Sequence, residues 1–454
     1  MWYIPNNVNT LYWGHHSVHI KKHLNFKSLR QAVSDLVSNF KDNRQIGKVD
    51  HSLHDSCLSA LAMMFFQDPS MLAFQKRLQN LCSMNNLKTL FDVQSIPKES
   101  QMKDVLDSIC YKSFYPIFPE FLSRLQRSKE LDKFKYINDS YLLALDGTQY
   151  FSSENIGCDH CLTKKLKSGN ILFYHQAIAA TIVHPKRRQV IPLAPEPITN
   201  NDGSKKQDCE RNAGKRIVQR IRKTHPKLSL IILGDDLYSN DPFIQRVKED
   251  KMSFIFVAKP SSHKFMFECL NDLSDLGDIQ TFQCTDTKGR SHVYKWYNSI
   301  PLTKTQYKKD YVNFFEYAII DKNKTTFKSS WVTDITISQD NVEKLVKAAR
   351  SRWKIENEAF NTLKNQGYHA EHNFGHGSCN LSFNFFIFNL IAFFMHQISE
   401  MTDRYYQDCR KEFTSKKEFW NNIRTAARLL VFSSWEKLLV YVTDPPEACA
   451  WQPP

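Results

Sequence analysis

The fold is best predicted from residues 141–148, Tyr141-Leu142-Leu143-Ala144-Leu145-Asp146-Gly147-Thr148, where an apolar run ends in an aspartate and a turn. A second stretch repeats this pattern, because Leu230-Ile231-Ile232-Leu233 precedes Gly234 and Asp235. Short apolar runs of this kind predict buried strands. Open α/β sheets place functional groups at the carboxyl ends of their strands. We therefore expect Asp146 and Asp235 to project toward the same point at one edge of a sheet.

A third carboxylate, Glu356, lies in a long helical pattern. Asp340 and Glu343 resemble a capping box at its start, and no glycine or proline interrupts it before Gly367. Apolar residues recur every three or four positions and form a stripe that contains Glu356; they are Val342, Leu345, Val346, Ala349, Trp353, Phe360 and Leu363. A carboxylate on a buried face is costly unless it is paired or binds a metal.

Two interpretations of Glu356 follow from this pattern. Arg352 lies one turn earlier and can pair with it, which would make the two residues a structural ion pair. The other interpretation is a metal ligand, because three carboxylates delivered by two strands and a helix suit two divalent ions over a phosphodiester. Glu358 is the nearest alternative glutamate, and its polar helical neighbours predict that it is solvated.

Composition favours a polyanionic partner. The chain has 454 residues, enough for two or three domains, and its net charge of +14 is spread along its length. Such a charge favours nucleic acid first and an anionic membrane second. Eleven cysteines and no secretory pattern at the start predict a reducing compartment. The longest apolar run, Phe383 to Met395, falls short of the roughly 20 residues of a membrane helix, and we expect a buried helix there.

The periodicity divides the chain into five segments. Residues 1–135 are expected to form a helical N-terminal domain that binds DNA ends. Residues 136–261 contain both strand aspartates, two antiparallel strands near 171–183 and 189–193, and a basic helix from Asp208 to His225. Residues 262–335 alternate like strands and predict a β-rich insertion. Residues 336–400 carry the Glu356 helix, and residues 401–454 form a helical C-terminal segment.

This order of elements resembles the RNase H-like, retroviral integrase-type fold of bacterial insertion-sequence DDE transposases. Leu145-Asp146-Gly147-Thr148 is similar to their first-aspartate motif, and Gly234-Asp235-Asp236-Leu237-Tyr238 to their second. Arg352-Trp353-Lys354-Ile355-Glu356 resembles the Arg-x-x-x-Glu core of the Tyr-Arg-Glu-Lys signature class. The resemblance covers roughly residues 50–400. The signature tyrosine falls on Ala349, and the signature lysine falls on Leu363, with Lys364 one residue later.

The resemblance implies a magnesium- or manganese-dependent DNA transposase. Asp146, Asp235 and Glu356 would hold the ions and Arg352 and Lys364 would position DNA, for hydrolysis at transposon ends and then transesterification into target DNA. The partners would be terminal inverted repeats, target DNA and a second copy of the chain, in a bacterial cytoplasm close to the nucleoid. Two alternatives stay open: a metal-dependent nuclease without strand transfer, and an inactive transposase-derived DNA-binding protein.

Two further groups of residues have functional interpretations. Cys158-x-x-Cys161 and the histidines His369, His372 and His376 predict a structural zinc site, with Cys158, Cys161, His372 and His376 as the ligand set; reduced surface cysteines are the alternative. The helix at 208–225 carries Lys215, Arg216 and Arg220, which either contact the DNA backbone or form a solvated face. Asp208 and Glu210 fit the first turn of that helix, where they would complement its dipole.

Overall fold

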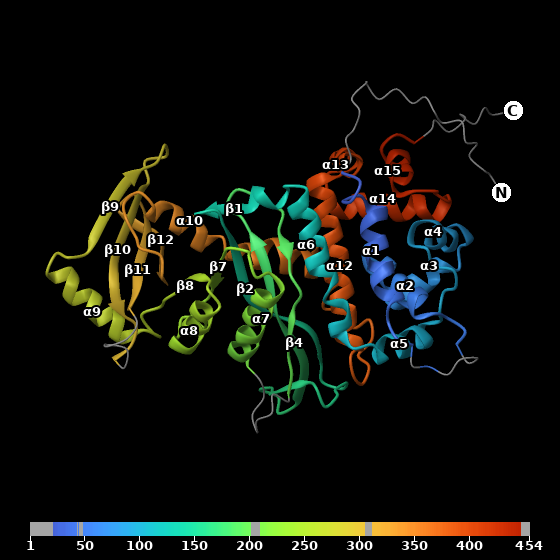
Figure 1. Ribbon diagram of the computed structural model, residues 1–454, viewed down its shortest axis with the longest axis horizontal. Coiled ribbons are helices and arrows are strands. Elements are labelled where there is room, and N and C mark those ends of the chain that lie inside the picture. The colour runs from blue at the N-terminus through green and yellow to red at the C-terminus, as the bar shows by residue number, and fades with distance from the viewer. Residues whose placement is uncertain (1–20, 43, 45–48, 201–208, 305–310, 446–454) are drawn as a thin grey trace.

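The computed structural model describes residues 21–42, 44, 49–200, 209–304 and 311–445. Figure 1 shows an elongated molecule with helices at one end and a single sheet that runs from the middle to the other end, where its strands are long. The prediction of an α/β fold with a mixed sheet and helical segments near both termini is confirmed.

The helical end is built from both ends of the chain. Asn86 donates hydrogen bonds from Nδ2 to the carbonyls of Ala427 (2.7 Å) and Leu430 (2.6 Å), and the rings of Phe26 and Trp435 lie 5.3 Å apart. The N-terminal elements are α1 (Phe26–Ser38), α2 (Leu53–Phe65), α3 (Met71–Leu78), α4 (Leu81–Phe91), α5 (Glu99–Ser108), η1 (Tyr111–Phe114), α6 (Ile117–Arg127) and η2 (Leu131–Phe134). The C-terminal ones are α12 (Leu381–Thr402), α13 (Arg404–Lys411), α14 (Lys416–Leu429) and α15 (Trp435–Thr443).

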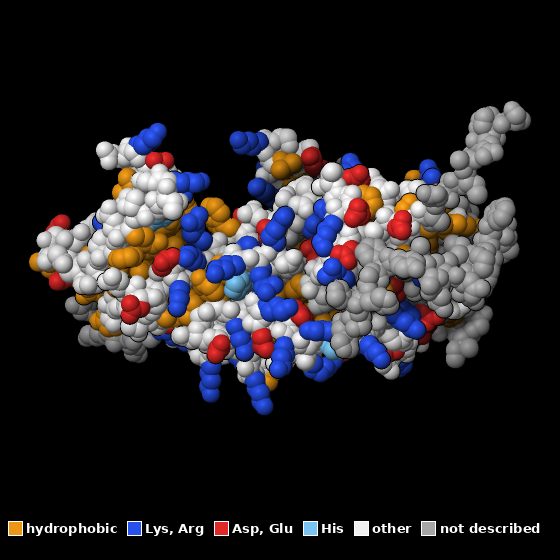
Figure 2. Space-filling model, turned by 90° about the horizontal axis from the view of Figure 1, so that it is seen from above, with side chains coloured by type: hydrophobic (Ala, Val, Ile, Leu, Met, Phe, Trp, Pro, Cys, Tyr) orange, Lys and Arg blue, Asp and Glu red, His pale blue; other side chains and the backbone are white. Residues whose placement is uncertain are grey.

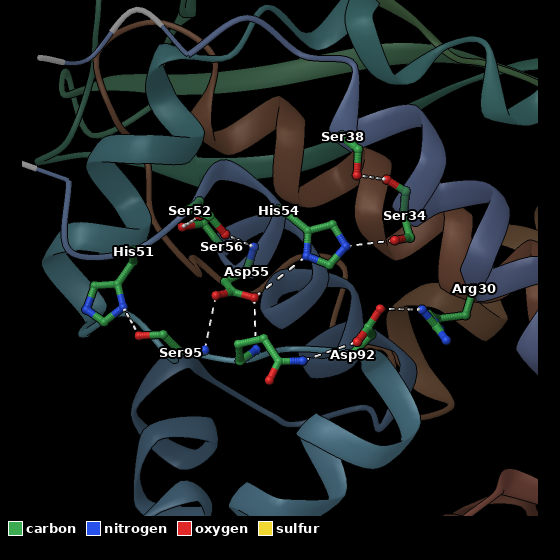
Figure 3. Close-up of polar contacts among 11 residues, drawn as sticks. Arg30, Ser34, Ser38, His51, Ser52, His54, Asp55, Ser56, Asp92 and Ser95 are labelled. Atoms are coloured by element: carbon green, nitrogen blue, oxygen red, sulfur yellow. Dashed lines mark hydrogen bonds and ion pairs between the residues drawn. The ribbon is translucent and has the colours of Figure 1, made fainter. Parts of the chain in front are cut away.

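Asp55 and His54 of α2 bind polar groups of neighbouring segments in the helical end. Figure 3 shows the carboxylate of Asp55, on α2, which accepts hydrogen bonds from the backbone N–H groups of Gln94 and Ser95, both at 3.0 Å. His54 Nε2 lies 2.7 Å from the hydroxyl of Ser34 on α1. These contacts fasten α1 and the chain between α4 and α5 to α2. The cluster is therefore a structural one, since its buried donors and acceptors satisfy each other.

Helix α12 lies between the sheet and the N-terminal helices (Figure 1), and it contacts α2, α5 and β5. It is long and apolar enough to span a bilayer, but 94% of its most apolar window is buried inside the protein. The side-chain amides of its asparagines donate to backbone carbonyls, as when Asn384 donates to Leu106 (2.7 Å) and Ile109 (2.8 Å). The predicted buried helix at 383–395 is confirmed, because packing against α2 and α5 uses its apolar surface.

The sheet has the order β3-β4-β2-β7-β8-β12-β11-β10-β9. β2 is parallel to β7, and β7 to β8, whereas β4 is antiparallel to β2. The described strands are β1 (Lys135–Ile137), β2 (Ser140–Ser153), β3 (Leu162–Lys165), β4 (Ile171–Val183), β5 (Ile191–Pro192), β6 (Glu196–Ile198), β7 (Leu230–Gly234), β8 (Ser253–Val257), β9 (Gln280–Thr285), β10 (Ser291–Pro301), β11 (Tyr311–Asp321) and β12 (Lys324–Thr333). The two predicted apolar runs are thus adjacent parallel strands, β2 and β7.

Helices cover both faces of the middle of the sheet. In Figure 1, α7 (Glu210–Thr224) and α8 (Asp241–Glu249) lie in front of the strands, and the orange segment that contains α10 (Val342–Arg350) lies behind them. The π-helical segment η4 (Ile355–Phe360) contacts β2 and β4, and α11 (Asn361–Asn365) follows it. This layering fits strands that are apolar on both sides, such as β7, which is buried throughout.

Residues 262–335 differ from the purely strand-like expectation. They begin with a helix, α9 (Lys264–Asp275), before the strands β9 to β12. These strands extend the central sheet, because β12 pairs antiparallel with β8. The β11–β12 turn is formed by Lys322 and Asn323, which both have positive φ (48° and 64°), as a tight hairpin turn requires.

The helix predicted around Glu356 is interrupted. α10 ends at Arg350, and its N-cap is Asn341, so the proposed capping box of Asp340 and Glu343 is not formed. Ser351 Oγ donates to the carbonyl of Lys347 at 2.7 Å, a contact that bends helices, and the chain then widens into η4. Trp353 is 54% exposed and leaves the predicted apolar stripe. Local π-helical geometry of this kind is frequent at functional sites.

Candidate functional site

Asp146 and Asp235 lie at the same level of the sheet. The last pair between the parallel strands β2 and β7 joins Ala144 to Leu233, and each aspartate follows its member of that pair by two residues. β7 ends at Gly234, whereas β2 continues past Asp146 along β4. The predicted strand end is confirmed before Asp235 and is wrong for Asp146, because β2 continues to Ser153. The two aspartates still lie on neighbouring strands at the level where β7 ends, as the two apolar runs predict.

Asp235 and its neighbour Asp236 have different roles. Asp235 Oδ1 accepts the backbone N–H of Leu237 (2.9 Å) in the turn after β7. Asp236 is engaged by the chain after β8: its Oδ1 accepts the N–H of Lys259 (2.8 Å) and lies 3.3 Å from His263 Nε2. Asp236 thus holds a loop in place, and Asp235 is the aspartate directed to the site.

Arg352 joins Glu356 to Asp146. Its Nη1 lies 2.7 Å from Glu356 Oε1 and 3.4 Å from Asp146 Oδ2. The predicted Arg352–Glu356 pair is confirmed, but the predicted burial of Glu356 is wrong, because its side chain is 47% exposed. The regular helical spacing assumed in the prediction is lost, because α10 ends at Arg350 and the chain becomes π-helical from Ile355. The carboxylate of Glu356 is therefore accessible to solvent and is held beside Asp146 by Arg352.

Glu210 is a fourth carboxylate that the sequence analysis assigned to a helix first turn. It begins α7, and its Oε1 accepts a hydrogen bond from the buried hydroxyl of Tyr238 at 3.3 Å. A Cβ on Gly147 would lie 2.9 Å from this carboxylate, so the residue after Asp146 has to be glycine for Glu210 to approach. Only the packing of α7 against the sheet brings Glu210 here, and no local pattern predicts it.

Burial and neighbouring charges shift the pKa values of the carboxyl groups of Asp146, Asp235 and Glu210. Burial is the main cause that raises the pKa of Asp146 to about 7; Arg352 opposes the rise, and the negative charges of Glu356, Glu210 and Asp235 add to it. Burial also raises the pKa of Asp235 and of Glu210, and in Glu210 the charge of Asp235 contributes. One guanidinium thus balances several acids, an arrangement that attracts further cations.

The other predicted DNA-contacting residues lie on two helices, α7 and α11. Arg216 Nε and Arg220 Nη1 lie 2.9 Å and 2.5 Å from the two carboxylate oxygens of Glu196, and Arg220 also covers the ring of Tyr115 at 4.3 Å. These two arginines attach α7 to β6. Lys364 Nζ pairs with Glu371 at 2.7 Å. Lys215 is half-buried on α7.

Figure 2 shows Lys and Arg side chains gathered on the face of the molecule that lies above α10, β1 and α6 in Figure 1. Between the Glu356 segment and helices α12 to α14 lies a groove of about 660 Å³. Five basic residues are among those that line it: Arg188, Arg410, Lys411, Lys416 and Lys417. Glu358 lines the same groove. Glu356 and Glu358 therefore point to different places, and Glu356 is the one beside Asp146.

A separate Cys/His cluster lies farther along β2 and β4. Its members are Cys158, Cys161, His175 and His376, and their ligand atoms all lie within 4.8 Å of one another. Among the described residues, the carboxylates of Asp146, Glu210, Asp235 and Glu356 do not form a group with oxygen atoms within this distance. The cluster could hold a metal ion. The two cysteines and His376 were predicted to share a site, and the structure brings them together.

His372, the fourth ligand in the predicted set, is not part of this cluster. Its spacing from His376 would place both on one side of a helix, but residues 366–380 are not helical, and the His372 ring packs against Phe374 at 4.9 Å. His175 takes its place from β4. The pairing of β4 with β2, which sets Phe151 opposite His175, carries it there, and that register is not visible in the local sequence.

No protein-family model matches this sequence, and no curated protein matches it significantly.

Proposed function

We propose that the chain is a DNA transposase of the DDE type, which cuts transposon ends and joins them to target DNA. One observation carries the proposal: Asp146 lies on β2 beside the point where the parallel strand β7 ends before Asp235, and Arg352, in the turn between α10 and η4, bridges Asp146 to Glu356. Carboxylates on rigid elements around an accessible point are suited to metal-assisted phosphodiester chemistry.

The sheet supports an RNase H-like core. β4, β2, β7 and β8 are consecutive, with β4 antiparallel and the others parallel, and α7 and α8 connect the parallel strands. In chain order, β2, β4 and β5 precede α7 and β7. This agrees with the order on which the resemblance rests: a strand with Asp146, two further strands, a helix and a strand before Asp235. The strands β9 to β12 lie between β8 and the Glu356 helix in sequence, where the resemblance places an insertion.

Mg²⁺ or Mn²⁺ is the cofactor that fits the carboxylates. Asp146, Asp235 and Glu356 offer hard oxygen donors, which favour these ions. Burial raises the pKa of Asp146 and of Asp235, and neighbouring carboxylates add to the rise in both, so a bound cation would favour their charged forms. When bound, the ions would activate water or a 3′-hydroxyl and stabilise the leaving oxygen. Arg352 would hold Glu356 toward Asp146, and its guanidinium has the geometry to contact a phosphate.

For the Cys/His cluster we propose zinc. Two thiolates and two imidazoles are the donors of structural zinc sites, and none of them suits Mg²⁺. The cluster and the carboxylates would therefore carry different ions with different tasks. The partners in this proposal are transposon ends and target DNA, bound by two copies of the chain, with contacts from the basic groove as well as from the core.

A plasmid that carries the sequences flanking the gene provides the test. With Mg²⁺ we expect cuts at the ends and then joined products, with no products in EDTA. Cutting without joining would favour a nuclease that lacks strand transfer. End binding without cutting, in a folded protein supplied with Mg²⁺ or Mn²⁺, would favour the inactive DNA-binding alternative.

A further inference from the structure

The Cys/His cluster joins segments that lie far apart in the sequence. Cys158 and Cys161 lie in the turn between β2 and β3, and His175 lies on β4. His376 comes from the chain between α11 and α12, which follows the Glu356 segment. Cys161 and His376 are separated by 215 positions. A contact among these groups thus determines where the chain after Glu356 meets the sheet.

The distances among the four ligand atoms match the edges of a tetrahedron around zinc. With ordinary Zn–S and Zn–N bonds, those edges would be about 3.8 Å between two sulfurs, about 3.5 Å between sulfur and nitrogen and about 3.3 Å between nitrogens. Cys158 Sγ and Cys161 Sγ lie 3.8 Å apart, far beyond a disulfide bond. Three of the four sulfur–nitrogen distances are 3.8, 3.5 and 3.3 Å, and the two Nε2 atoms lie 3.1 Å apart. The fourth, from Cys158 Sγ to His376, is within 4.8 Å.

The surroundings prepare the ligands for an ion. His376 Nδ1 lies 2.8 Å from the carbonyl of Gly377, so Nδ1 carries the hydrogen and Nε2 keeps a lone pair directed into the cluster. The ring of His376 also packs against Phe151 at 4.5 Å. Cys161 and His175 are buried, whereas Cys158 and His376 are half-buried, so the cluster is partly shielded from water.

Charge balance also favours zinc. Two thiols would release their protons to solvent on binding, and the two thiolates would neutralise the charge of Zn²⁺. The resulting centre carries no net charge, which suits its burial. Four protein ligands complete a tetrahedral shell and leave no position for substrate, as in structural zinc sites.

We infer that Cys158, Cys161, His175 and His376 bind one Zn²⁺, which fastens the chain after the Glu356 segment to β2 and β4. Asp107 on α5 fastens the same chain from the other side. Its carboxylate accepts backbone N–H groups from four consecutive residues, Ser378, Cys379, Asn380 and Leu381, at 2.8–3.0 Å. The ion and Asp107 together fix the path from Glu356 to α12. This inference does not require the carboxylates to be catalytic.

Metal analysis of the full-length protein, purified without chelator, provides the first test. We expect about one zinc per chain in the wild type. Replacement by Co²⁺ should give the intense visible absorption and sulfur-to-metal charge-transfer bands of a tetrahedral thiolate site. A wild type without zinc that also fails to bind Co²⁺ in this way would overturn the inference, and this measurement needs no variant to fold.

Matched substitutions identify the ligands. Cys161→Ser and His175→Ala should lose the zinc and lower the melting temperature by several degrees. The controls are His372→Ala, the histidine expected from the sequence, and Cys379→Ser, an exposed cysteine close to His376. Both controls should keep one zinc per chain. Zinc retained by His175→Ala, or lost from His372→Ala while the protein stays folded, would overturn the ligand assignment.

Discussion

The carboxylate site and the Cys/His cluster are built on the same elements but differ in how closely their ligand atoms are packed. Both depend on β2 and on the chain that contains Glu356, which supplies His376 about 20 residues later. The ligand atoms of the cluster already lie at tetrahedral spacing. The carboxylates are gathered around Arg352 but do not form so tight a group.

Charge explains this difference. Neutral thiols and imidazoles pack together without repulsion, so a closed site can form during folding. Carboxylates repel one another in a site of low polarity, and burial raises the pKa of Asp146 to about 7. A permanent structural ion suits the first arrangement, and exchangeable ions that arrive with DNA suit the second. The two sites should therefore respond differently to the same treatments.

The largest expected effect is on DNA cleavage. Asp146→Asn, Asp235→Asn and Glu356→Gln should each lower the cleavage rate by a factor of about 10³ or more, because metal ligands act as a unit. Zinc content should not change. The matched control is Glu358→Gln, whose side chain lines the basic groove and should leave cleavage within a few-fold of wild type. A dead Glu358→Gln with an active Glu356→Gln would reverse the assignment.

Chelation should separate the two metals. Brief treatment with EDTA should abolish cleavage, and Mg²⁺ should restore it fully, while zinc content and melting temperature stay unchanged. The reason is that a buried four-ligand site exchanges its ion slowly, whereas the carboxylate site is accessible. Loss of zinc in the same brief treatment, measured by mass spectrometry, would contradict this separation.

Substitution should affect stability with opposite signs at the two sites. Asp146 has a folded-state pKa raised to about 7 from 3.8, so its ionisation costs folding free energy between these values and above. In EDTA, Asp146→Asn should therefore stabilise the protein by up to about 4 kcal/mol at pH 8 and by almost nothing at pH 4. Cys161→Ser should instead destabilise the zinc-loaded protein. Denaturant unfolding at both pH values measures this, and an Asp146→Asn variant less stable at pH 8 than the wild type would contradict it.

The smallest expected effect concerns the basic groove. Lys417→Ala removes one exposed cation from the groove, and should weaken DNA binding a few-fold and lower the salt slope by about 1. Lys288→Ala removes one exposed cation from the β9–β10 turn and serves as the charge-matched control. Equal effects from both substitutions would show that the groove has no special role. Point substitutions are preferable to removing residues 1–135, because α14 and α15 pack against that segment.

Local sequence patterns predict most of the helices and strands, but they do not predict which strands pair or how the helices pack on the sheet. The apolar parts of β2 and β7, the basic helix α7 and the buried helix α12 follow from local periodicity. The end of β2 does not, because its pairing with β4 continues past Asp146. Glu210 and His175 do not, because packing of α7 and the pairing of β4 bring them to their sites. The break before Glu356 depends on a side chain of Ser351 that bonds back to Lys347, which competes with a strong helical pattern.

The most direct test of the account is a change of metal specificity at Asp235. Asp235→Cys replaces a hard oxygen donor by a thiolate, which Mn²⁺ accepts more readily than Mg²⁺. We predict that this variant cleaves transposon-end DNA with Mn²⁺ but not with Mg²⁺, while the wild type uses both. Wild-type activity of the variant with Mg²⁺, or no activity with either ion in a folded protein that binds DNA, would contradict the claim that Asp235 holds a catalytic metal.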